Sequence, residues 1–388
     1  MKLPKLTVWR AIFVAILLSG LYATYLRIFY GLGGSTNLSD QFPWGIWIGF
    51  DVMCGVGLAA GGFTLVAIVH IFNIEKYRPV LRPAILTAFL GYVLVVVGLL
   101  YDLGRPDRLW HPLVMWNPHS VMFEVAWCVT LYSTVLFLEF LPVVLEKFGF
   151  HKPMEWIHRI SVPLMILGIL LSTLHQSSIG SLFLIVPSKL YPLWYSPLLP
   201  LLFYVSGIAV GMAMTIFESW HSSKACGRAL ELPLLASLGR VLAVAMSVFL
   251  WLRFLDLAHR DALRLLSRNR IETWLFLLEI WLMLVPTILL FQKRVRLNPH
   301  ALYGCAVTIV LGFVANRMNV ATTGMEAGSG THYIPKWSEL AITLSIIAVG
   351  FATFRVIAEY FPIFEAEEAA SGSAEHAEEP TRELAGVR

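Results

Sequence analysis

Residues 83–101 read PAILTAFLGYVLVVVGLLY, an apolar run that contains no charged side chain. A helix of about 20 such residues is long enough to cross the hydrocarbon core of a bilayer. The whole chain is similarly apolar, since 57% of its 388 residues are hydrophobic and 14% are charged. Soluble proteins have about 25% charged residues. The mean hydropathy of +0.71 is also high, as expected for a membrane protein. The sequence therefore predicts an all-α polytopic membrane protein.

Ten apolar windows of this length predict about ten transmembrane helices. They cover residues 9–30, 45–71, 83–101, 120–145, 160–180, 197–220, 234–257, 272–291, 300–318 and 337–360. The fifth window carries polar residues, so the apolar pattern does not fix its outer end. Residues 1–361 then form one transmembrane domain. Residues 362–388 are rich in Ala, Glu and Ser without an apolar period, which predicts a disordered, acidic, cytoplasmic tail.

Lys and Arg in the short loops indicate the orientation of the chain in the membrane. The basic segments are the N-terminus and loops 72–82, 146–159, 221–233 and 292–299. They alternate with loops 31–44, 181–196 and 319–336, each of which carries at most one Lys or Arg. This pattern predicts that both termini lie in the cytoplasm. Loop 258–271 departs from it, because it should lie outside yet contains four arginines. Two interpretations stay open: a basic interfacial helix on lipid headgroups, or a docking surface for a partner.

Two stretches are unusually polar for such a chain. Residues 101–124 read YDLGRPDRLWHPLVMWNPHSVMFE, and residues 172–181 read STLHQSSIGS. A charged side chain at the centre of a membrane helix costs about 2.5–3.5 kcal/mol. On the predicted topology, five helices bring polar groups to the outer face, which predicts one binding site there. The site would comprise Asp51, Asp102, Arg105, His111, Glu124, His175, Gln176, Asn316 and Arg317.

Single members of this set also have structural interpretations. Asp102 and Arg105 could form an ion pair that caps a helix. Glu124 could bind the amides of a first helical turn, and His175 could hydrogen-bond a neighbouring helix. The convergence of all the polar groups on one face favours a binding site over these separate roles.

A quinone fits such a site better than a metal does. Its tail would lie in lipid, its carbonyl oxygens need donors, and its reduction needs two protons from positioned side chains. No His-x-x-x-His spacing occurs, the four cysteines are scattered singly, and His70 and His175 fall at opposite ends of their helices. Haem and iron–sulfur groups need paired or clustered ligands. The sequence therefore predicts no metal site, no haem and no iron–sulfur cluster in this chain, with quinone as a substrate.

Several acidic residues lie in apolar windows away from the predicted site. Glu139, Glu218 and Glu279, with Glu359, are expected toward the cytoplasmic face. They could form part of a proton path to the quinone. The alternative is that those near helix ends reach out to water at the membrane surface.

Five motifs show a family resemblance. They are DLGRP (102–106), RLWHP (108–112), WNPHSVMFE (116–124), STLHQSSIGSLF (172–183) and ANRMN (315–319). Together they resemble the NrfD/PsrC family of integral membrane subunits, and within it the HybB-type subunits of membrane-bound [NiFe] uptake hydrogenases. The resemblance implies two four-helix bundles plus an extra helix pair, without a cofactor of their own. It also implies a quinone site near the periplasmic surface and a ferredoxin-like iron–sulfur partner.

The resemblance also implies functions for individual residues. Asp102, Arg105, His111, Glu124 and His175 would line or support the quinone headgroup, with Asn316 and Arg317 as weaker members from the second bundle. The chain would lie in the bacterial inner membrane, with its partners on the periplasmic side.

The predicted function is that of a quinone-reactive subunit in a respiratory [NiFe] hydrogenase complex. It would pass electrons from a periplasmic iron–sulfur protein to menaquinone, beside the large and small hydrogenase subunits, with proton translocation as an added hypothesis. One alternative is the quinol-oxidising membrane subunit of a molybdopterin or sulfur-compound reductase. An alternative of another class is a secondary transporter, which would have broken helices at mid-membrane.

Overall fold

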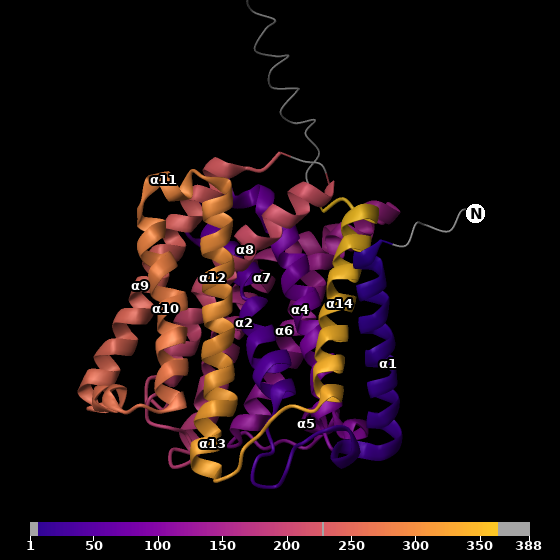
Figure 1. The fold of residues 1–388 in the computed structure, drawn as a ribbon. Helices are drawn as coiled ribbons and strands as arrows, with labels where there is room; N and C mark the ends of the chain where they lie inside the picture. The colour runs from indigo at the N-terminus through magenta and orange to yellow at the C-terminus, as the bar shows by residue number, and fades with distance from the viewer. Residues whose placement is uncertain (1–6, 227–228, 364–388) are drawn as a thin grey trace, which may run out of the picture.

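The computed structural model describes residues 7–226 and 229–363 as a set of long helices that run side by side (Figure 1). Within this part of the chain, ten helices are long and apolar enough to cross a membrane, one for each predicted window. The predicted fold class is confirmed. The tail predicted over 362–388 lies outside the described residues, except for its first two positions.

Nine of the ten spans contain one long α-helix each. These are α1 (Val8–Ser35), α4 (Leu81–Asp102), α6 (Val121–Phe148), α7 (His151–Ser181), α8 (Leu199–Cys226), α9 (Leu232–His259), α10 (Ile271–Phe291), α12 (Pro299–Met318) and α14 (Trp337–Tyr360). The second span consists of the pieces η1 (Trp47–Cys54), α2 (Gly55–Leu58), α3 (Gly61–Val66) and η2 (Ala67–Ile71). Short helices connect the spans or extend them: η3 (Glu75–Val80), η4 (Pro106–Arg108), α5 (His111–Val114), η5 (Leu182–Ile185), η6 (Ala262–Ser267), α11 (Lys293–Arg296), η7 (Asn319–Thr323) and α13 (Gly324–Ser329).

The long helices form two bundles and a pair. The second span packs with α4, α6 and α7 in the first bundle, and α8, α9, α10 and α12 form the second bundle. Helices α1 and α14 lie against each other beside α4, at the edge of the molecule in Figure 1. Contacts of α8 with α3 and α7 join the two bundles. Two four-helix bundles plus an extra pair were therefore predicted correctly.

The connections lie at two opposite ends, which are named here after helices labelled in Figure 1. The α5 end holds residues 36–46, 103–120, 186–198, 260–270 and 330–336, and the α11 end holds residues 72–80, 149–150, 229–231 and 292–298. The predicted orientation corresponds to a periplasmic α5 end and a cytoplasmic α11 end.

Helix α7 differs from its prediction. The fifth window predicted a helix over 160–180, whereas α7 has 31 residues and is the longest helix described. The polar residues 151–159 continue the helix beyond the apolar window, so the apolar window marked only part of it. Gly149 has φ 70°, a left-handed conformation that ends α6, and only Gly149 and Phe150 separate the two helices.

The basic loop 258–271 is only partly helical. Helix α9 continues to His259, and η6 is a short 3₁₀ segment rather than a long interfacial helix. Arg260 donates to Asp256 Oδ2 at 2.6 Å and to the carbonyl oxygen of Pro192 at 3.0 Å. Arg264 pairs with Asp261 at 2.5 Å, where both side chains are exposed. Two of the four arginines are therefore paired locally, and one of them fastens the loop before α8 to α9.

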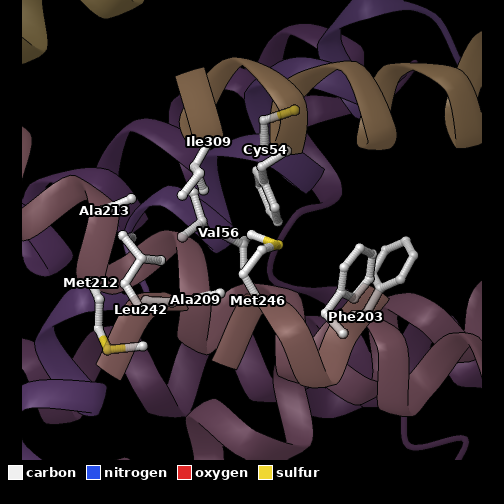
Figure 2. Packing of buried hydrophobic residues seen from close by; sticks show 14 of the residues in the cluster. Cys54, Val56, Phe203, Ala209, Met212, Ala213, Leu242, Met246 and Ile309 are labelled. Carbon is white, nitrogen blue, oxygen red and sulfur yellow. The ribbon is translucent and has the colours of Figure 1, made fainter. Parts of the chain in front are cut away.

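The two bundles meet where small residues let their backbones approach closely. A Cβ atom on Gly211 of α8 would lie 2.6 Å from the backbone nitrogen of Gly61 in α3. Figure 2 shows the neighbouring core, in which Val56 of the second span lies near Ala209 of α8 and Met246 of α9. Small residues at helix contacts are a common basis of association in membranes, where van der Waals contact replaces the hydrophobic effect.

This contact gives a stability prediction. Gly211→Ala would place a methyl group against backbone atoms that cannot turn away, and overpacking of this kind costs about 1–3 kcal/mol. We expect a lower midpoint of thermal unfolding in detergent. Gly304→Ala on α12 is the control, because a Cβ atom there meets nothing within 4 Å. Equal midpoints for the two variants would contradict the proposed close contact.

Candidate functional site

One group of buried polar residues lies at the α5 end, where α1, η1, α4 and α14 meet. We call it the junction cluster, and it consists of Arg27, Asp51, Asp102, Glu339 and Thr343. Thr343 Oγ1 donates to Asp51 Oδ2 at 2.8 Å. The Arg27 guanidinium donates to the carbonyl oxygens of Tyr101 and Leu103, each at 2.7 Å, and its charge interacts with Asp102. Arg27 thereby provides hydrogen-bond donors for the free carbonyl oxygens at the end of α4.

The junction cluster holds three carboxyl groups and one guanidinium. The charges of Asp51 and Glu339 both interact with that of Asp102. Oδ1 of Asp102 is buried without a hydrogen-bond partner. Ionised carboxylates that share a buried site repel one another, which suits such a group to binding and releasing protons.

Glu339 also ties the start of α14 to the neighbouring loops. Its Oε2 accepts from the backbone N–H of Lys336 at 2.7 Å and of Asn37 at 3.1 Å. Its Oε1 accepts from the Tyr333 hydroxyl at 2.6 Å. Burial, followed by this hydrogen bond to Glu339, raises the pKa of the Tyr333 hydroxyl above its usual range. Tyr333 therefore remains a donor to Glu339 at neutral pH.

A second group lies inside the first bundle. We call it the first-bundle column, and it consists of Tyr92, Tyr132, Ser172 and His175. The ring of Tyr92 lies 4.6 Å from that of Tyr132 and 5.5 Å from that of His175, between centroids. The hydroxyl of Tyr92 and both nitrogens of His175 are buried without a hydrogen-bond partner, and the buried hydroxyls of Tyr132 and Ser172 interact only with each other. A lone buried polar group costs about 1–3 kcal/mol, and ordered water commonly satisfies such groups.

Two glutamates of α6 lie beyond the two ends of the column. Toward the α5 end, Glu124 accepts a hydrogen bond from Ser178 Oγ. Toward the α11 end, Glu139 interacts electrostatically with Tyr132. Fifteen residues separate the two glutamates, which is about 22 Å along a helix. Ionisable and polar groups therefore extend through most of a hydrocarbon core about 30 Å thick.

A third group lies in the second bundle around Glu279, whose side chain is fully buried. The carboxylate accepts from Asn316 Nδ2 at 2.6 Å, Asn319 Nδ2 at 2.9 Å and Trp194 Nε1 at 2.9 Å. We call these four residues and Arg317 the second-bundle network. Glu279 was expected toward the cytoplasmic face, away from Asn316, and that placement is wrong. Helix α10 begins at the α5 end, so its ninth residue is still near that end.

Arg317 completes this network. It donates to Asn316 Oδ1 at 2.7 Å and to Ser206 Oγ at 2.8 Å. Its guanidinium carbon lies 3.5 Å from the ring centroid of Phe203, a cation–π contact. A buried arginine needs such partners to offset its loss of hydration. The network thus cross-links α8, α10 and α12.

Other predicted site residues lie apart from these groups. Arg105 pairs with Asp107, at 2.9 and 3.0 Å, and not with Asp102. Both side chains are more than half exposed, and the hydrogen bond from Arg105 holds the pKa of the Asp107 carboxyl below its usual range. His111 lies against Trp110 on the same surface loop. Gln176 is buried and donates to the carbonyl oxygen of Val56 at 3.0 Å, which links α7 to α2.

The structure therefore divides the nine predicted residues among several places. Asp51 and Asp102 share the junction cluster, Asn316 and Arg317 share the second-bundle network, and Glu124 and His175 belong to the line of groups in the first bundle. The sequence interpretation missed Arg27, Glu339 and Thr343. Arg27 did carry a signal, since it is a lone charge near the end of an apolar window.

Comparison with known proteins gives several relatives that cover most of the chain. A protein of Nitratidesulfovibrio vulgaris is 38% identical over 90% of this chain and 92% of its own. The probable Ni/Fe-hydrogenase 2 b-type cytochrome subunit of Escherichia coli is 34% identical over 87% of each chain. The integral membrane subunit of the N. vulgaris menaquinone reductase is 29% identical over 94% of each chain.

The name of the E. coli relative corrects one prediction. A b-type cytochrome carries haem, so the name contradicts the prediction that this chain carries none, and we withdraw that prediction. The described side chains nevertheless do not fit a haem. His175 is the only buried histidine among them, and it does not border the cavity of about 690 Å³ beside α14. His221 does border the cavity, but it is exposed and its Nε2 lies 2.9 Å from the hydroxyl of Tyr303. Haem iron needs an accessible axial ligand such as histidine, and we assign no step of the reaction to a haem.

The family match agrees with the motifs quoted above. The family described as "Polysulphide reductase, NrfD" matches residues 34–326, well over half of the chain. These residues include all five motifs and all nine predicted site residues. Together with two relatives above 30% identity over most of their length, this match shows that the chain belongs to the NrfD family.

Proposed function

We propose that this chain is the quinone-reactive membrane subunit of a respiratory [NiFe] hydrogenase complex. The observation that carries the proposal is the junction cluster, where buried carboxyls meet at one end of an otherwise apolar protein. The names of two relatives support it, one a hydrogenase subunit and the other part of a menaquinone reductase. The physiological substrate would be menaquinone.

Reduction of the quinone consumes two electrons and two protons and gives the quinol. The electrons come from a reduced iron–sulfur partner that is itself oxidised. This chain's own task is to bind the ring and to deliver protons to its two oxygens. Asp102 has a buried carboxyl oxygen with no partner, and Asp51 lies beside it, so these two carboxyls are the proposed proton donors.

The partner would dock at the α5 end. Electron transfer needs a short distance, so the last iron–sulfur cluster of the partner must lie near the junction cluster. The surface loop there presents Trp110, Trp116 and Arg105, all exposed. Aromatic residues and arginine are enriched at protein interfaces. With the predicted orientation, the partner would be a periplasmic ferredoxin-like subunit that connects to the hydrogenase large and small subunits.

The family description favours a second candidate function. A polysulphide reductase, as the family description names it, reduces a sulfur compound. A membrane subunit of such an enzyme would supply the electrons by oxidising quinol, the reverse of the direction proposed for this chain. The same junction cluster would then accept protons from the quinol. Purification of the complex through a tag on this chain separates the two functions. We expect hydrogen-dependent reduction of menaquinone, whereas co-purification of a molybdopterin subunit without hydrogen oxidation would favour the reductase.

We further propose that protons move along the first-bundle column. Glu139 would take up protons toward the α11 end, and the buried hydroxyls and imidazole would pass them toward Glu124. Glu218 of α8, which accepts from Thr87 of α4, stays a predicted member of such a path. Glu279 differs from Glu139, because its carboxylate already accepts three hydrogen bonds, and these favour a structural role.

The first prediction concerns the quinone site. Asp102→Asn and His175→Ala are expected to abolish menaquinone-linked hydrogen oxidation, because each removes a group that holds or passes protons. Hydrogen oxidation with a soluble artificial dye should persist, since the dye bypasses the quinone. Asp107→Asn is the control, because Asp107 is exposed and paired with Arg105. Loss of the dye reaction in the two test variants would indicate a role in assembly instead.

The second prediction concerns the proton path. In proteoliposomes that contain the whole complex and a pH probe, Glu139→Gln should abolish proton uptake from the α11 side during quinone reduction. Glu146→Gln is the matched control, because Glu146 lies on the same helix and pairs with Arg82 near the surface. If the wild-type complex reduces quinone without such proton uptake, the proposed path is wrong.

A further inference from the structure

The protein contains one large apolar cavity among the described residues that no role above uses. Its volume is about 690 Å³, and α2, α4, α8 and α14 line it. Asp51 of η1 lies at its α5 end, and Glu218 and His221 of α8 lie toward its α11 end. Leucine, isoleucine and phenylalanine side chains line most of the length between them. Ligand sites of about 300–1,000 Å³ with few polar groups are typical of small-molecule pockets.

The cavity is elongated and open toward the side of the molecule. On α14 its lining runs from Ile346 to Glu359, thirteen residues apart, or about 20 Å along the helix. Phe351, also on α14, lines the cavity and is 59% exposed. This exposed position lies within the apolar span Trp337–Tyr360. A ligand would therefore enter from the lipid phase, and it would be long, narrow and apolar.

The two ends of the cavity differ in what they offer to a polar headgroup. At the α11 end, Glu218 Oε2 already accepts from Thr87 Oγ1 at 2.6 Å, and His221 Nε2 lies 2.9 Å from the hydroxyl of Tyr303. At the α5 end, Asp51 belongs to the junction cluster, in which a carboxyl oxygen of Asp102 has no partner. Arg355 and Glu359 also line the α11 end, but both are exposed. The buried hydrogen-bonding capacity without a partner therefore lies at the α5 end.

Gly98 keeps this end of the cavity compact. A Cβ atom on Gly98 would lie 2.8 Å from the Cβ atom of Asp51. Any larger residue would push Asp51 out of its position between α4 and the hydroxyl of Thr343. The carboxyl thus stays at the head of the cavity, next to its apolar length.

We infer that this cavity binds the isoprenoid tail of the quinone, with the headgroup directed toward Asp51 and Asp102. This inference rests on the proposed function, and it replaces the expectation that the tail lies free in lipid. A polar group at one end and about 20 Å of apolar wall match a ring that carries a long hydrocarbon chain. Binding of the tail also raises the local concentration of the ring at the carboxyls and limits the orientations of the ring there.

The test compares quinones with and without a tail in the purified whole complex. Ile347→Trp fills the cavity from α14, because Ile347 lines it. We expect the KM for long-tailed menaquinone to rise about tenfold, as for the loss of a sizeable apolar contact. The KM for a tailless naphthoquinone should stay unchanged. Leu344→Trp is the matched control, since Leu344 is an exposed residue of α14 outside the cavity.

Three outcomes would overturn the inference. One is an equal change, or no change, in the KM values of both quinones for Ile347→Trp. Another is an equal effect of Leu344→Trp. The third comes from the wild-type complex and a menaquinone with a photoreactive group at the end of its tail. The photoreactive group should cross-link to residues near Glu359. If it cross-links elsewhere and a phospholipid is retained in the cavity, the cavity binds a structural lipid instead.

The same measurements distinguish a failure of the proposed function from a failure of this inference. If the wild-type complex reduces neither the tailed nor the tailless quinone with any donor, the quinone role itself is wrong. If it reduces both and the cavity variants have no selective effect, the role stands and only the position of the tail is wrong. The photo-cross-linking measurement needs no variant and decides the position even where Ile347→Trp assembles poorly.

Discussion

The hydrocarbon core of a bilayer contains no hydrogen-bond partners, and this constraint governs every polar group in the protein. Backbone groups satisfy it by forming helices. Polar side chains satisfy it only through one another, so each must face a neighbouring helix. Arg27 illustrates the consequence, because its guanidinium reaches across from α1 to two carbonyl oxygens at the end of α4. The pair of α1 and α14 is thereby joined to the first bundle by a polar contact as well as by apolar contact.

The two bundles meet the same constraint in different ways. In the second bundle, Glu279 has three donors and Arg317 has two side-chain acceptors, while Nε of the buried Arg253, whose charge interacts with Glu279, has no partner. In the first bundle, Tyr92 and His175 have buried polar atoms without partners. A satisfied buried network rigidifies a structure, whereas a buried group without a partner calls for an explanation such as a catalytic role. Under the proposed function, the network around Glu279 is a scaffold and the first bundle contains the groups that transfer protons.

The junction cluster and the cavity combine two properties that a lipid-soluble electron carrier requires. Asp51 belongs to both, since it accepts from Thr343 and also lines the cavity. Carboxyls that lie close together in a buried site favour holding one proton between them, and an apolar cavity accommodates a hydrocarbon chain. The meeting of η1, α4 and α14 places the junction cluster at one end of the cavity.

The sequence alone determined the ten spans, the fold class and the ends at which the polar motifs lie, because hydrophobicity and length are properties of a local segment. It did not determine which polar groups meet. Arg105 pairs with Asp107 rather than Asp102, and Glu279 binds Asn316 rather than facing the opposite side. These pairings depend on the rotation of each helix about its axis and on which helices become neighbours. Only the tertiary structure fixed both, and it alone brought Arg27 and Thr343, from opposite ends of the chain, beside two carboxyls that the motifs had already indicated.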